Sequence, residues 1–379
     1  MFVIMKFNKI KQIQKVLKKQ NIDSLVLVKT DNIKDPNFDN LVESNLSFGI
    51  LIISKKKIKL LITKLDEIPI FKDNVVEVKI IEKAKDIYSS FKKSNKIALN
   101  YSSITLSFFN TFKKNVIKNS NNKIKLIDFK ELSEINLCKD NSEIKFLKKS
   151  IKITESILLK LFEKLDKSTF KYEKEVVNFL KVETLLNDCE LAFEPLVASG
   201  VNSKNPHYYP KDKSKLKKGF CIIDFGVKYK GFCSDMTRTV FFGTPSKKHI
   251  SDYNLILNSF NSVNIFFKKI NTNTNNNNSS NKNNIKAKDL FSFFQSNEFP
   301  MIHALGHGIG LEVHEKPLLA NSNDVLMENM VLAIEPGKYD FKNYGIRIED
   351  DFLVINSSNN LKLKRLSKLT NDLLVFNLN

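Results

Sequence analysis

Cysteine is scarce in this chain, with only four among 379 residues. None stands in a Cys-x-x-Cys spacing, so neither a zinc knuckle nor a thiol redox motif is signalled. Their low density argues against a disulfide scaffold and is typical of a reducing compartment. We therefore predict a cytoplasmic protein. The four are Cys138, Cys189, Cys221 and Cys233.

Long apolar runs are also absent. No stretch reaches the roughly 18 apolar residues that cross a bilayer as a helix. The first residues, Met-Phe-Val-Ile-Met-Lys, lack the sustained apolar stretch and the small-residue cleavage site of a signal peptide. The sequence favours a soluble protein with no membrane partner.

Acidic residues are outnumbered, with 41 Asp and Glu against 61 Lys and Arg and a net charge of +20. Because Lys and Arg neutralise phosphates, this charge raises the hypothesis of nucleic-acid binding. The excess is nearly all Lys, spread along the chain among many Asn, Ile and Phe residues. There is no RNP-like motif, no Arg-rich arm and no aromatic–basic interleaving. We interpret the charge as compositional background and predict no specific nucleic-acid partner.

The length suffices for two domains, and a hydrophobic content of 42% indicates a folded protein. Residues 1–135 are predicted to form a small α/β domain, because apolar segments alternate with amphipathic ones. A cluster of three lysines at 55–57 predicts a hairpin turn. Strands are expected at 24–28, 48–53, 58–62, 75–81 and 96–100, and helices at 10–19 and 84–92.

A second domain is predicted over residues 140–379, after a boundary near 134–141. Apolar residues three and four apart predict a long helix over 142–165, with Asn141 or Ser142 as its N-cap. A second helix is expected over 172–187. Residues 271–284 are a low-complexity, Asn-rich segment that predicts a surface loop.

Five potential metal ligands stand in short, strongly patterned contexts in the second domain. Four carboxylates and one imidazole supply too many oxygen ligands for a closed structural zinc site. They suit a pair of divalent ions that share carboxylate ligands and bind a water molecule between them. This arrangement is typical of a hydrolase. The five are Asp224 (Ile-Ile-Asp-Phe-Gly), Asp235 (Cys-Ser-Asp-Met-Thr-Arg-Thr), His307 (Gly-His-Gly-Ile-Gly), Glu335 (Ala-Ile-Glu-Pro-Gly) and Glu349 (Arg-Ile-Glu-Asp).

Two hairpins are predicted to bring these ligands together. Residues 219–226 and 231–243 are β-rich and are joined by Val-Lys-Tyr-Lys, so Asp224 and Asp235 are expected on neighbouring strands. Glu335, after a strand at 331–334, is expected beside Glu349 on a strand at 345–355. Within that strand, the period of two places Arg347, Glu349 and Asp351 on one face, with Asp350 pointing away from the metals.

The combination of these residues is more informative than any one of them. A single acidic residue in a strand is usually solvated, and a lone histidine is usually structural. Here the acidic residues lie between Ile, Ala, Phe and Gly, where they would be buried, unpaired charges that cost several kcal/mol each. Two divalent cations would remove that cost.

The motifs around these residues resemble those of a known family. The ligand contexts, together with His303-Ala-Leu-Gly-His-Gly-Ile-Gly-Leu-Glu-Val-His314-Glu, resemble those of the Xaa-Pro peptidases, prolidase and Xaa-Pro aminopeptidase. These are dinuclear metallopeptidases of the pita-bread fold. The resemblance is close over residues 195–355 and loose before 140. It implies an α/β (α+β) fold in which a creatinase/prolidase-type N-terminal domain, echoed by Asp35-Pro-Asn-Phe38, precedes a catalytic pita-bread domain.

The resemblance also implies a role for each ligand. Asp224 would chelate one ion, Asp235 and Glu349 would bridge both, and His307 and Glu335 would complete the other site. The two ions would lower the pKa of a bridging water and polarise the scissile carbonyl. Glu335 would serve as general base and proton shuttle.

Four further residues match positions outside the metal set. His207 and His314 would contact the substrate and stabilise the tetrahedral intermediate. His303 would line the pocket for the proline side. Arg347 would pair with a ligand carboxylate. Proline suits a dedicated site because its nitrogen carries no hydrogen and its ring fixes φ.

The expected function is removal or splitting of an N-terminal residue from proline in short peptides. Oxygen-rich ligands favour Mn²⁺, with Co²⁺ or Zn²⁺ as alternatives, and the family implies a homodimer. The choice between dipeptidase and aminopeptidase stays open. Three other functions remain as alternatives: a methionine aminopeptidase, a metal-independent creatinase-like enzyme, and a non-catalytic peptide-binding protein on the same fold.

Overall fold

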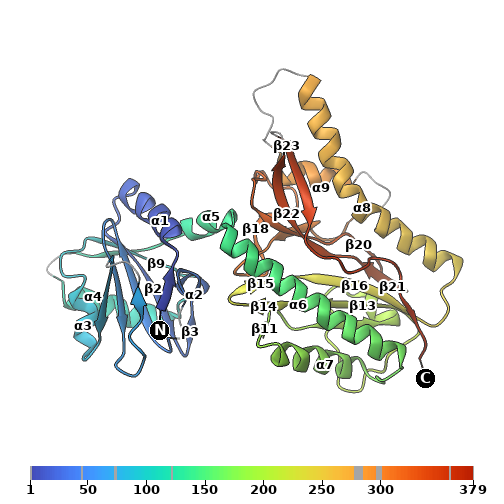
Figure 1. Cartoon of the computed structure of the whole chain (residues 1–379), viewed down its shortest axis with the longest axis horizontal. Coiled ribbons are helices and arrows are strands. Elements are labelled where there is room, and N and C mark those ends of the chain that lie inside the picture. Colours follow the sequence, from blue (N-terminus) through green and yellow to red (C-terminus); the bar gives the residue numbers. More distant parts are fainter. Residues whose placement is uncertain are drawn as a thin grey trace. The chain divides into compact units, whose positions relative to one another are not determined.

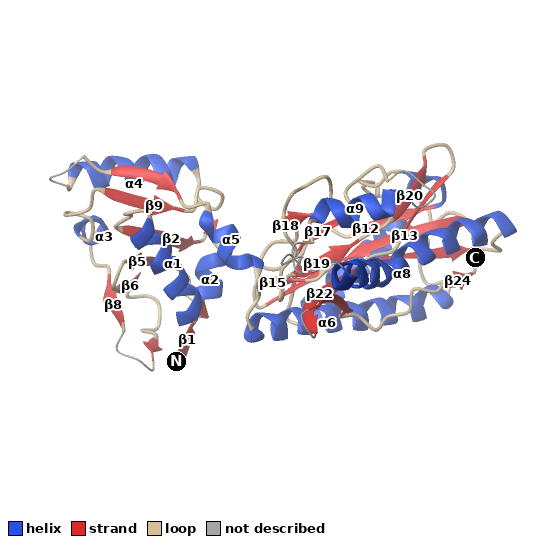
Figure 2. Ribbon diagram, turned by 90° about the horizontal axis from the view of Figure 1, so that it is seen from above, coloured by secondary structure: helices blue, strands red, loops and turns tan. Residues whose placement is uncertain are grey.

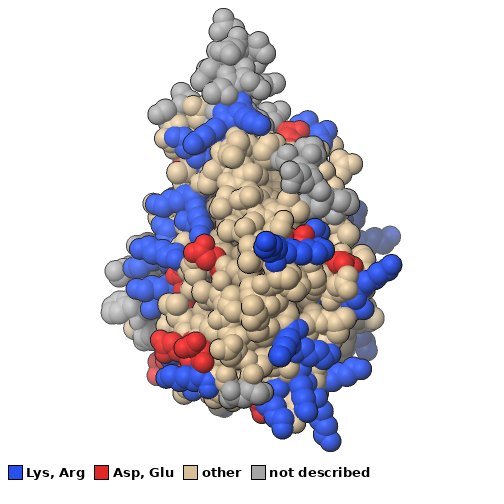
Figure 3. Space-filling model, turned by 90° about the vertical axis from the view of Figure 1, so that its right-hand side faces the viewer, with Lys and Arg blue, Asp and Glu red and all other residues tan. Residues whose placement is uncertain are grey.

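The computed structural model describes residues 2–43, 46–71, 75–120, 123–276, 285–295, 301–357 and 360–378. The chain divides into two compact units, residues 1–136 and 137–379. No helix in the described part of the chain is long and apolar enough to span a membrane. Figure 3 shows one face of the molecule, on which Lys and Arg side chains are more widespread than Asp and Glu.

The first unit is built on a mixed sheet with the strand order β10-β9-β2-β5-β6-β8, with β3 paired to β2. Strand β2 shows why a sheet forms here: its side chains alternate between two apolar clusters. Leu25 and Leu27 pack on one face with helix α1, and Val26 and Val28 pack on the other with helix α4. Figure 2 shows α4 running beside β9.

Every strand and helix predicted for this unit is present in the structure. The three lysines at 55–57 lie between β5 and β6. The strands are β1 (Phe2–Met5), β2 (Ser24–Thr30), β3 (Ile33–Lys34), β4 (Val42–Glu43), β5 (Gly49–Ser54), β6 (Ile58–Ile62), β7 (Ile70–Phe71), β8 (Val76–Ile80), β9 (Lys96–Leu99) and β10 (Lys125–Asp128). The helices are α1 (Phe7–Lys19), α2 (Pro36–Leu41), α3 (Ala84–Ser89), α4 (Leu106–Lys118) and α5 (Glu131–Leu137).

The second unit begins with the long helix α6 (Asn141–Asp166). Its predicted N-cap, Asn141 or Ser142, is wrong, because Asp140 caps it. The Asp140 carboxylate accepts hydrogen bonds from the backbone N–H groups of Ser142 and Glu143, at 2.8 and 2.9 Å. The Glu143 carboxylate in turn accepts from the Asp140 N–H at 2.9 Å, so this is a complete capping box.

Three further helices and one 3₁₀ turn complete the helical part of the second unit as described. They are α7 (Glu173–Leu186), η1 (Gly200–Lys204), α8 (Lys247–Asn276) and α9 (Ala287–Gln295). The expected surface loop at 271–284 is corrected in its first part, because residues 271–276 continue α8. The remainder of that segment lies outside the described residues.

Two sheets form the centre of this unit. One has the order β12-β13-β16-β24 and the other β18-β17-β19-β22-β23. Helices α6 and α7 cover the first sheet through one apolar cluster, and α8 and α9 cover the second through another. Figure 1 shows α6 and α7 near β13 and β16, and α8 near β22 and β23.

The strands of the second unit have the following bounds. They are β11 (Glu190–Leu191), β12 (Leu196–Ser199), β13 (Gly219–Phe225), β14 (Val227–Tyr229), β15 (Phe232–Cys233), β16 (Met236–Phe242), β17 (Gly306–Gly308), β18 (Glu315–Leu318), β19 (Val331–Ile334), β20 (Gly337–Asp340), β21 (Tyr344–Arg347), β22 (Asp350–Ser357), β23 (Asn360–Arg365) and β24 (Val375–Phe376).

Two details of the predicted hairpins are corrected. The Val-Lys-Tyr-Lys segment is mostly strand β14, and the chain reverses at Lys230 and Gly231, whose φ values are 48° and 83°. Positive φ at two successive residues is the requirement of a tight two-residue hairpin turn. The strand predicted over 345–355 is interrupted at Ile348 and Glu349, so β21 pairs with β20, and β22 pairs with β19 and β23.

Candidate metal centre

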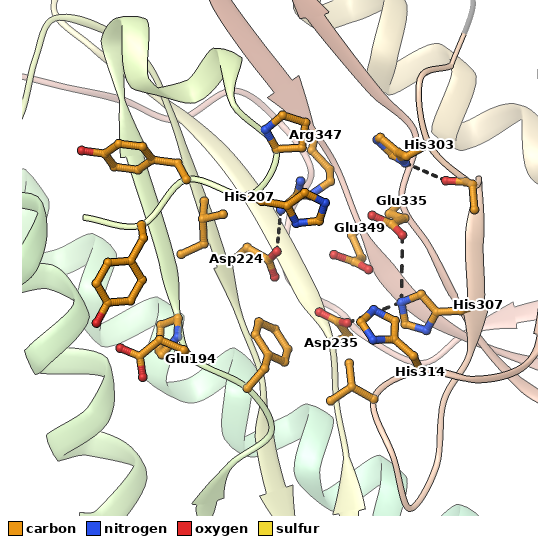
Figure 4. A pocket seen from close by; sticks show the side chains of 18 of the residues that line it. Glu194, His207, Asp224, Asp235, His303, His307, His314, Glu335, Arg347 and Glu349 are labelled. Atoms are coloured by element: carbon orange, nitrogen blue, oxygen red, sulfur yellow. Dashed lines mark hydrogen bonds and ion pairs between the residues drawn. The ribbon is translucent and has the colours of Figure 1, made fainter. Parts of the chain in front are cut away.

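A cavity of about 450 Å³ in the second unit brings the predicted site residues together. In Figure 4 the four acidic side chains point toward a common centre, with the imidazoles around it. All nine residues expected at the site line this cavity: Asp224, Asp235, His307, Glu335, Glu349, His207, His303, His314 and Arg347.

The first sheet contributes two of the carboxylates. Asp224 lies on β13 opposite Thr237 of β16, and Asp235 immediately precedes β16. A sharp bend separates β13 from β14 at Gly226, where a Cβ would lie only 1.9 Å from the carbonyl oxygen of Ser234. Only glycine permits this approach. The bend therefore helps to place the two aspartates side by side at the end of the hairpin.

The second sheet and the segments next to its strands contribute the other three candidate ligands. His307, on β17, lies opposite Ala333 of β19, and Glu335 directly follows β19, where its N–H donates to the carbonyl of Leu305 at 2.8 Å. Ile334 pairs with Asp350, so Glu335 lies beside Glu349 as expected from the sequence. The Glu349 N–H donates to the carbonyl of Thr237 at 3.2 Å, which joins the two sheets at the site.

Three of these residues form a compact ligand group. One donor atom each from Asp235, His307 and Glu349 lies within 4.8 Å of the others. His307 Nε2 is 3.7 Å from a carboxylate oxygen of Asp235 and 4.0 Å from one of Glu335. Its Nδ1 lies 3.0 Å from the carbonyl oxygen of Gly308, a contact in which Nδ1 carries the hydrogen and leaves Nε2 as an acceptor.

The His307 ring is held in its neutral form. Burial, followed by repulsion from His314, lowers the pKa of His307 to about 4. A neutral imidazole offers a lone pair, which is the form that binds metals. Near neutral pH the ring is therefore a ready donor beside the carboxylates.

The carboxylates, unlike His307, would carry negative charges that are buried close together. Burial and then mutual repulsion raise the pKa of Asp235 and Glu349 well above the usual range. Burial likewise raises the pKa of Glu335 to about 7, although Arg347 opposes the shift. Oδ1 of Asp224 and Oδ1 of Asp235 are buried without a hydrogen-bond partner in the described structure. Divalent cations would satisfy these oxygens and remove the repulsion, so the donor set fits metal ions.

A buried hydrogen-bond network behind the ligands includes residues that the sequence did not single out. Arg347 donates to Oδ2 of Asp224 at 2.5 Å, to the hydroxyl of Tyr339 at 2.7 Å and to that of Thr237 at 3.1 Å. The Thr237 hydroxyl donates to Oε2 of Glu349 at 2.7 Å. Thr237 and Tyr339 were missed, although Thr237 stands two residues after Asp235 in a strand and so shares its face.

Asp350 lies outside the ligand group. Its two carboxylate oxygens face Arg238 at 2.9 Å and Arg365 at 2.7 Å, and the Ser367 hydroxyl donates to it. The neighbouring Asp351 accepts from the N–H of Asp235 at 3.1 Å. Side chains therefore continue to alternate between the two faces across the break between β21 and β22. Asp350 points to the face opposite the cavity.

Three histidines complete the cavity wall. The ring of His314 lies 4.4 Å from that of His307, measured between centroids. Nδ1 of His303 is 2.6 Å from the carbonyl oxygen of Ala304, and its buried Nε2 has no hydrogen-bond partner in the described part of the chain. His207 follows η1, and Figure 4 shows it near Arg347. Burial lowers the pKa of His303 as well.

Residues 145–356 match the model of metallopeptidase family M24. This match covers more than half of the chain. The chain belongs to metallopeptidase family M24. The resemblance noted in the sequence is thereby confirmed, and the cluster of buried donors lies within the matched residues.

Relatives of this M24 metallopeptidase match it over nearly its whole length. A Xaa-Pro dipeptidase from Pyrococcus horikoshii is 27% identical over 372 residues, which cover 97% of this chain and 98% of that protein. The crystal structure of the prolidase from P. horikoshii has a TM-score of 0.76 at 28% identity and covers 97% of this chain and 100% of that chain. An X-Pro aminopeptidase from Thermotoga maritima has a TM-score of 0.77 at 27% identity, over 94% and 98% of the two chains.

These similarities confirm the expected fold of the M24 chain. An N-terminal α/β domain precedes a pita-bread domain, as in the prolidase and aminopeptidase structures. Membership of a metallopeptidase family also makes the protein a metal-dependent hydrolase. The buried donor group of Asp235, His307 and Glu349 is consistent with that chemistry.

Proposed function

We propose that this protein hydrolyses the bond between an N-terminal residue and proline in short peptides, using two divalent metal ions. The observation that carries the proposal is the convergence of four acidic side chains and one neutral histidine in a single cavity. Both aspartates, Asp224 and Asp235, have one buried oxygen without a hydrogen-bond partner among the described residues. Such an arrangement is costly without cations.

Five residues would hold the two ions. Asp224 would bind one ion, His307 and Glu335 would bind the other, and Asp235 and Glu349 would serve both. The ions, when bound, lower the pKa of a water molecule and polarise the carbonyl of the scissile bond. Arg347 fixes the Asp224 carboxylate through its 2.5 Å contact with Oδ2, and Oδ1 is left without a hydrogen-bond partner among the described residues.

Glu335 acts as general base and proton shuttle. Its carboxylate lines the cavity, and its backbone is fixed by the hydrogen bond to Leu305. Burial raises the pKa of Glu335 to about 7 in the metal-free protein. Cations nearby lower that value and favour the form that accepts a proton.

The non-ligand histidines bind the substrate. His207 and His314 face the developing negative charge of the tetrahedral intermediate, where a positioned hydrogen-bond donor is most valuable. His303, with a buried Nε2 and Tyr339 at 5.5 Å between ring centroids, lines the side that receives the proline ring. The imide nitrogen of proline donates no hydrogen bond, so this side of the pocket needs no acceptor for it.

The substrate class rests on the similar proteins together with the site. The relatives are named a Xaa-Pro dipeptidase and an X-Pro aminopeptidase, and the match covers nearly all of each. The test is cleavage of Ala-Pro, Ala-Pro-Ala and Met-Ala-Ser by purified protein supplied with Mn²⁺. Cleavage of Ala-Pro alone defines a dipeptidase, and cleavage of Ala-Pro-Ala defines an aminopeptidase. Cleavage of Met-Ala-Ser alone would replace the proline assignment with a methionine aminopeptidase.

Metal analysis tests the dinuclear centre separately. We expect about two divalent ions per chain after loading, as the ligand chemistry requires. Oxygen donors favour Mn²⁺ over Zn²⁺, and Co²⁺ should also activate. A chain that binds no divalent ion would be a creatinase-like enzyme or a non-catalytic peptide-binding protein instead.

Two further predictions belong to the same proposal: the protein forms a homodimer and works in the cytoplasm. The low number of cysteines, four in 379 residues, is compatible with a reducing compartment. Sedimentation of the purified protein at several concentrations tests the dimer, and fractionation of cells tests the location.

A further inference from the structure

His314 stands on a segment with no regular secondary structure, residues 309–314, between β17 and β18. The start of this segment is fixed by backbone hydrogen bonds: the Ile309 N–H donates to Val331 at 3.0 Å, and the Gly310 carbonyl accepts from Cys233 at 2.8 Å. Within the described residues, the backbone of His314 itself makes no hydrogen bond of this kind. The position of its ring therefore depends on the two ends of the segment, the second of which is Glu315, paired with Gly308 at the start of β18.

Glu315, the next residue, closes the segment with its side chain. Its Oε1 accepts from the N–H groups of Leu311 and Glu312, at 2.7 and 3.2 Å. Its Oε2 accepts from Nζ of Lys139 at 2.8 Å. One carboxylate thus joins both ends of the turn that carries His314.

Lys139, which donates to this carboxylate, is itself fixed in position by hydrogen bonds. It stands just before the α6 N-cap, its N–H donates to the carbonyl of Asn329 at 2.8 Å, and its Nζ also donates to the carbonyl of Leu137 at 3.2 Å. The side chains of Lys139 and Glu315 are only 3% and 13% exposed. A buried ion pair of this kind is rigid, and breaking it leaves an uncompensated charge.

Gly310 makes room for the pair. A Cβ at this position would lie 2.7 Å from both carboxylate oxygens of Glu315 and 2.8 Å from Cε of Lys139. The pair therefore fills the space beside the glycine, directly under the turn. Neither Lys139 nor Glu315 lines the cavity.

We propose that the Lys139–Glu315 ion pair is a positioning device for His314, with Glu315 holding the turn and Lys139 holding Glu315. This inference rests on the proposed function, in which His314 contacts the reacting group. A shift of about 1 Å in a positioned group can cost on the order of a hundredfold in rate. The pair therefore acts on turnover through His314 without touching the substrate.

The first test is kinetic and uses Glu315→Ala, Glu315→Gln and Lys139→Met with Ala-Pro or Ala-Pro-Ala. We expect Glu315→Ala to lower kcat by about tenfold to a hundredfold with a smaller change in KM. Glu315→Gln, which keeps an acceptor for the two N–H groups, should lose less. In the His314→Ala background, Glu315→Ala should cause little further loss, since residues that act as a unit are not additive.

The matched control is Lys160→Met, which breaks an exposed Lys–Glu pair of similar length, 2.7 Å, between α6 and α7. It should leave kcat and KM unchanged. Independent, additive losses from Glu315→Ala and His314→Ala would overturn the proposal. So would wild-type kcat in Glu315→Ala.

A second measurement does not depend on activity. The chain has five histidines, so the ¹H–¹³C signal of each ring can be assigned by replacing one at a time. We expect Glu315→Gln and Lys139→Met to shift or broaden the His314 signal and to leave that of His249, on α8, in place. An unmoved His314 signal would refute the positioning role. Failure of the wild-type protein to cleave any Xaa-Pro peptide, with the shift present, would instead refute the proposed function alone.

Discussion

At the scale of single residues, the site is defined by charges that the protein alone does not neutralise. Asp224 has one oxygen bound to Arg347 and the other without a partner in the described structure. Glu349 is fixed by Thr237, and His307 is fixed by Gly308. Three of the five candidate ligands are therefore oriented by a neighbour that lies outside the set, which is the usual way in which proteins prepare a metal site.

Replacing Glu335 by Gln tests the general base. The amide keeps the size of the side chain but neither accepts a proton in the same way nor carries a charge. We expect turnover to fall by at least about a hundredfold, while circular dichroism and the melting profile show a folded protein. Near wild-type kcat in a metal-loaded Glu335→Gln variant would contradict the assigned role.

Replacing His314 by Ala tests stabilisation of the intermediate. Loss of one positioned donor typically costs on the order of a hundredfold to a thousandfold in kcat. We expect the loss in kcat, with a metal content equal to that of the wild type, because His314 is not assigned as a ligand. Steady-state kinetics checks this, and an effect confined to KM would assign His314 to ground-state binding instead.

At the scale of elements, the site depends on how strand β22 is anchored. Asp350, at its first position, is fully buried between Arg238 of β16 and Arg365 of β23. Arg238 also donates to the carbonyl of Glu349 at 2.8 Å. This cluster joins the two sheets behind the candidate ligands and fixes the start of β22, directly after Glu349.

Replacing Asp350 by Asn should destabilise the fold. Removing one partner of a buried ion pair leaves an uncompensated charge and costs about 3–5 kcal/mol. Urea unfolding of the metal-free protein measures the change. Lys160→Ala, which breaks the exposed pair with Glu183, is the control and should cost less than about 1 kcal/mol. Equal costs for the two variants would show that the buried cluster has no special importance.

At the scale of the whole molecule, the acidic centre makes folding sensitive to pH and to metal. Burial raises the pKa of Glu335 from 4.5 to about 7, and those of Asp235 and Glu349 are also raised. At Glu335, the folded, metal-free protein therefore binds more protons than the unfolded chain above pH 4.5. Linkage then requires Glu335 to reduce stability as the pH rises from about 4.5 to 7, whereas His307, whose pKa is lowered to about 4, acts with the opposite sign below pH 6.5. A bound cation reverses the effect, because it prefers the deprotonated ligands.

We expect Mn²⁺ to raise the melting temperature more at pH 8 than at pH 6. A ligand at a hundred times its dissociation constant stabilises the folded state by about 2.7 kcal/mol, and competition with protons weakens binding at the lower pH. Calorimetry with and without Mn²⁺ provides the measurement. In Glu349→Gln the difference between the two pH values should shrink. An Mn²⁺ shift that is the same at both pH values would contradict this account.

The grouping of the five candidate ligands in one cavity could be predicted from the sequence because it depends on local patterns. The period of two placed Arg347 and Glu349 on one face, and the register of β19 with β22 brings Glu335 beside Glu349. The α6 cap was missed because Asp140, Asn141 and Ser142 are all good caps. Only the spacing from Asp140 to Glu143 distinguishes them.

The parts that escaped prediction depend on partners far away in the chain. Thr237 and Tyr339 have no distinctive sequence context. They belong to the site only because Arg347 donates a hydrogen bond to the hydroxyl group of each. Lys139 is one of many lysines, and only its contact with Glu315 distinguishes it. The turn at Lys230 and Gly231 was predicted a few residues too early, because Val-Lys-Tyr extends the hairpin as strand β14.

The distribution of the ligands over two sheets has a consequence for how the protein matures. Asp224 and Glu349 are brought together only when β13, β16, β19 and β22 have all formed and their sheets have joined through Thr237 and Glu349. Contacts between such distant parts of a chain form late, after the cost of closing long loops has been met. A newly made chain would thus acquire its metal ions last. Activity of the proposed peptidase would therefore appear only after the two sheets have joined.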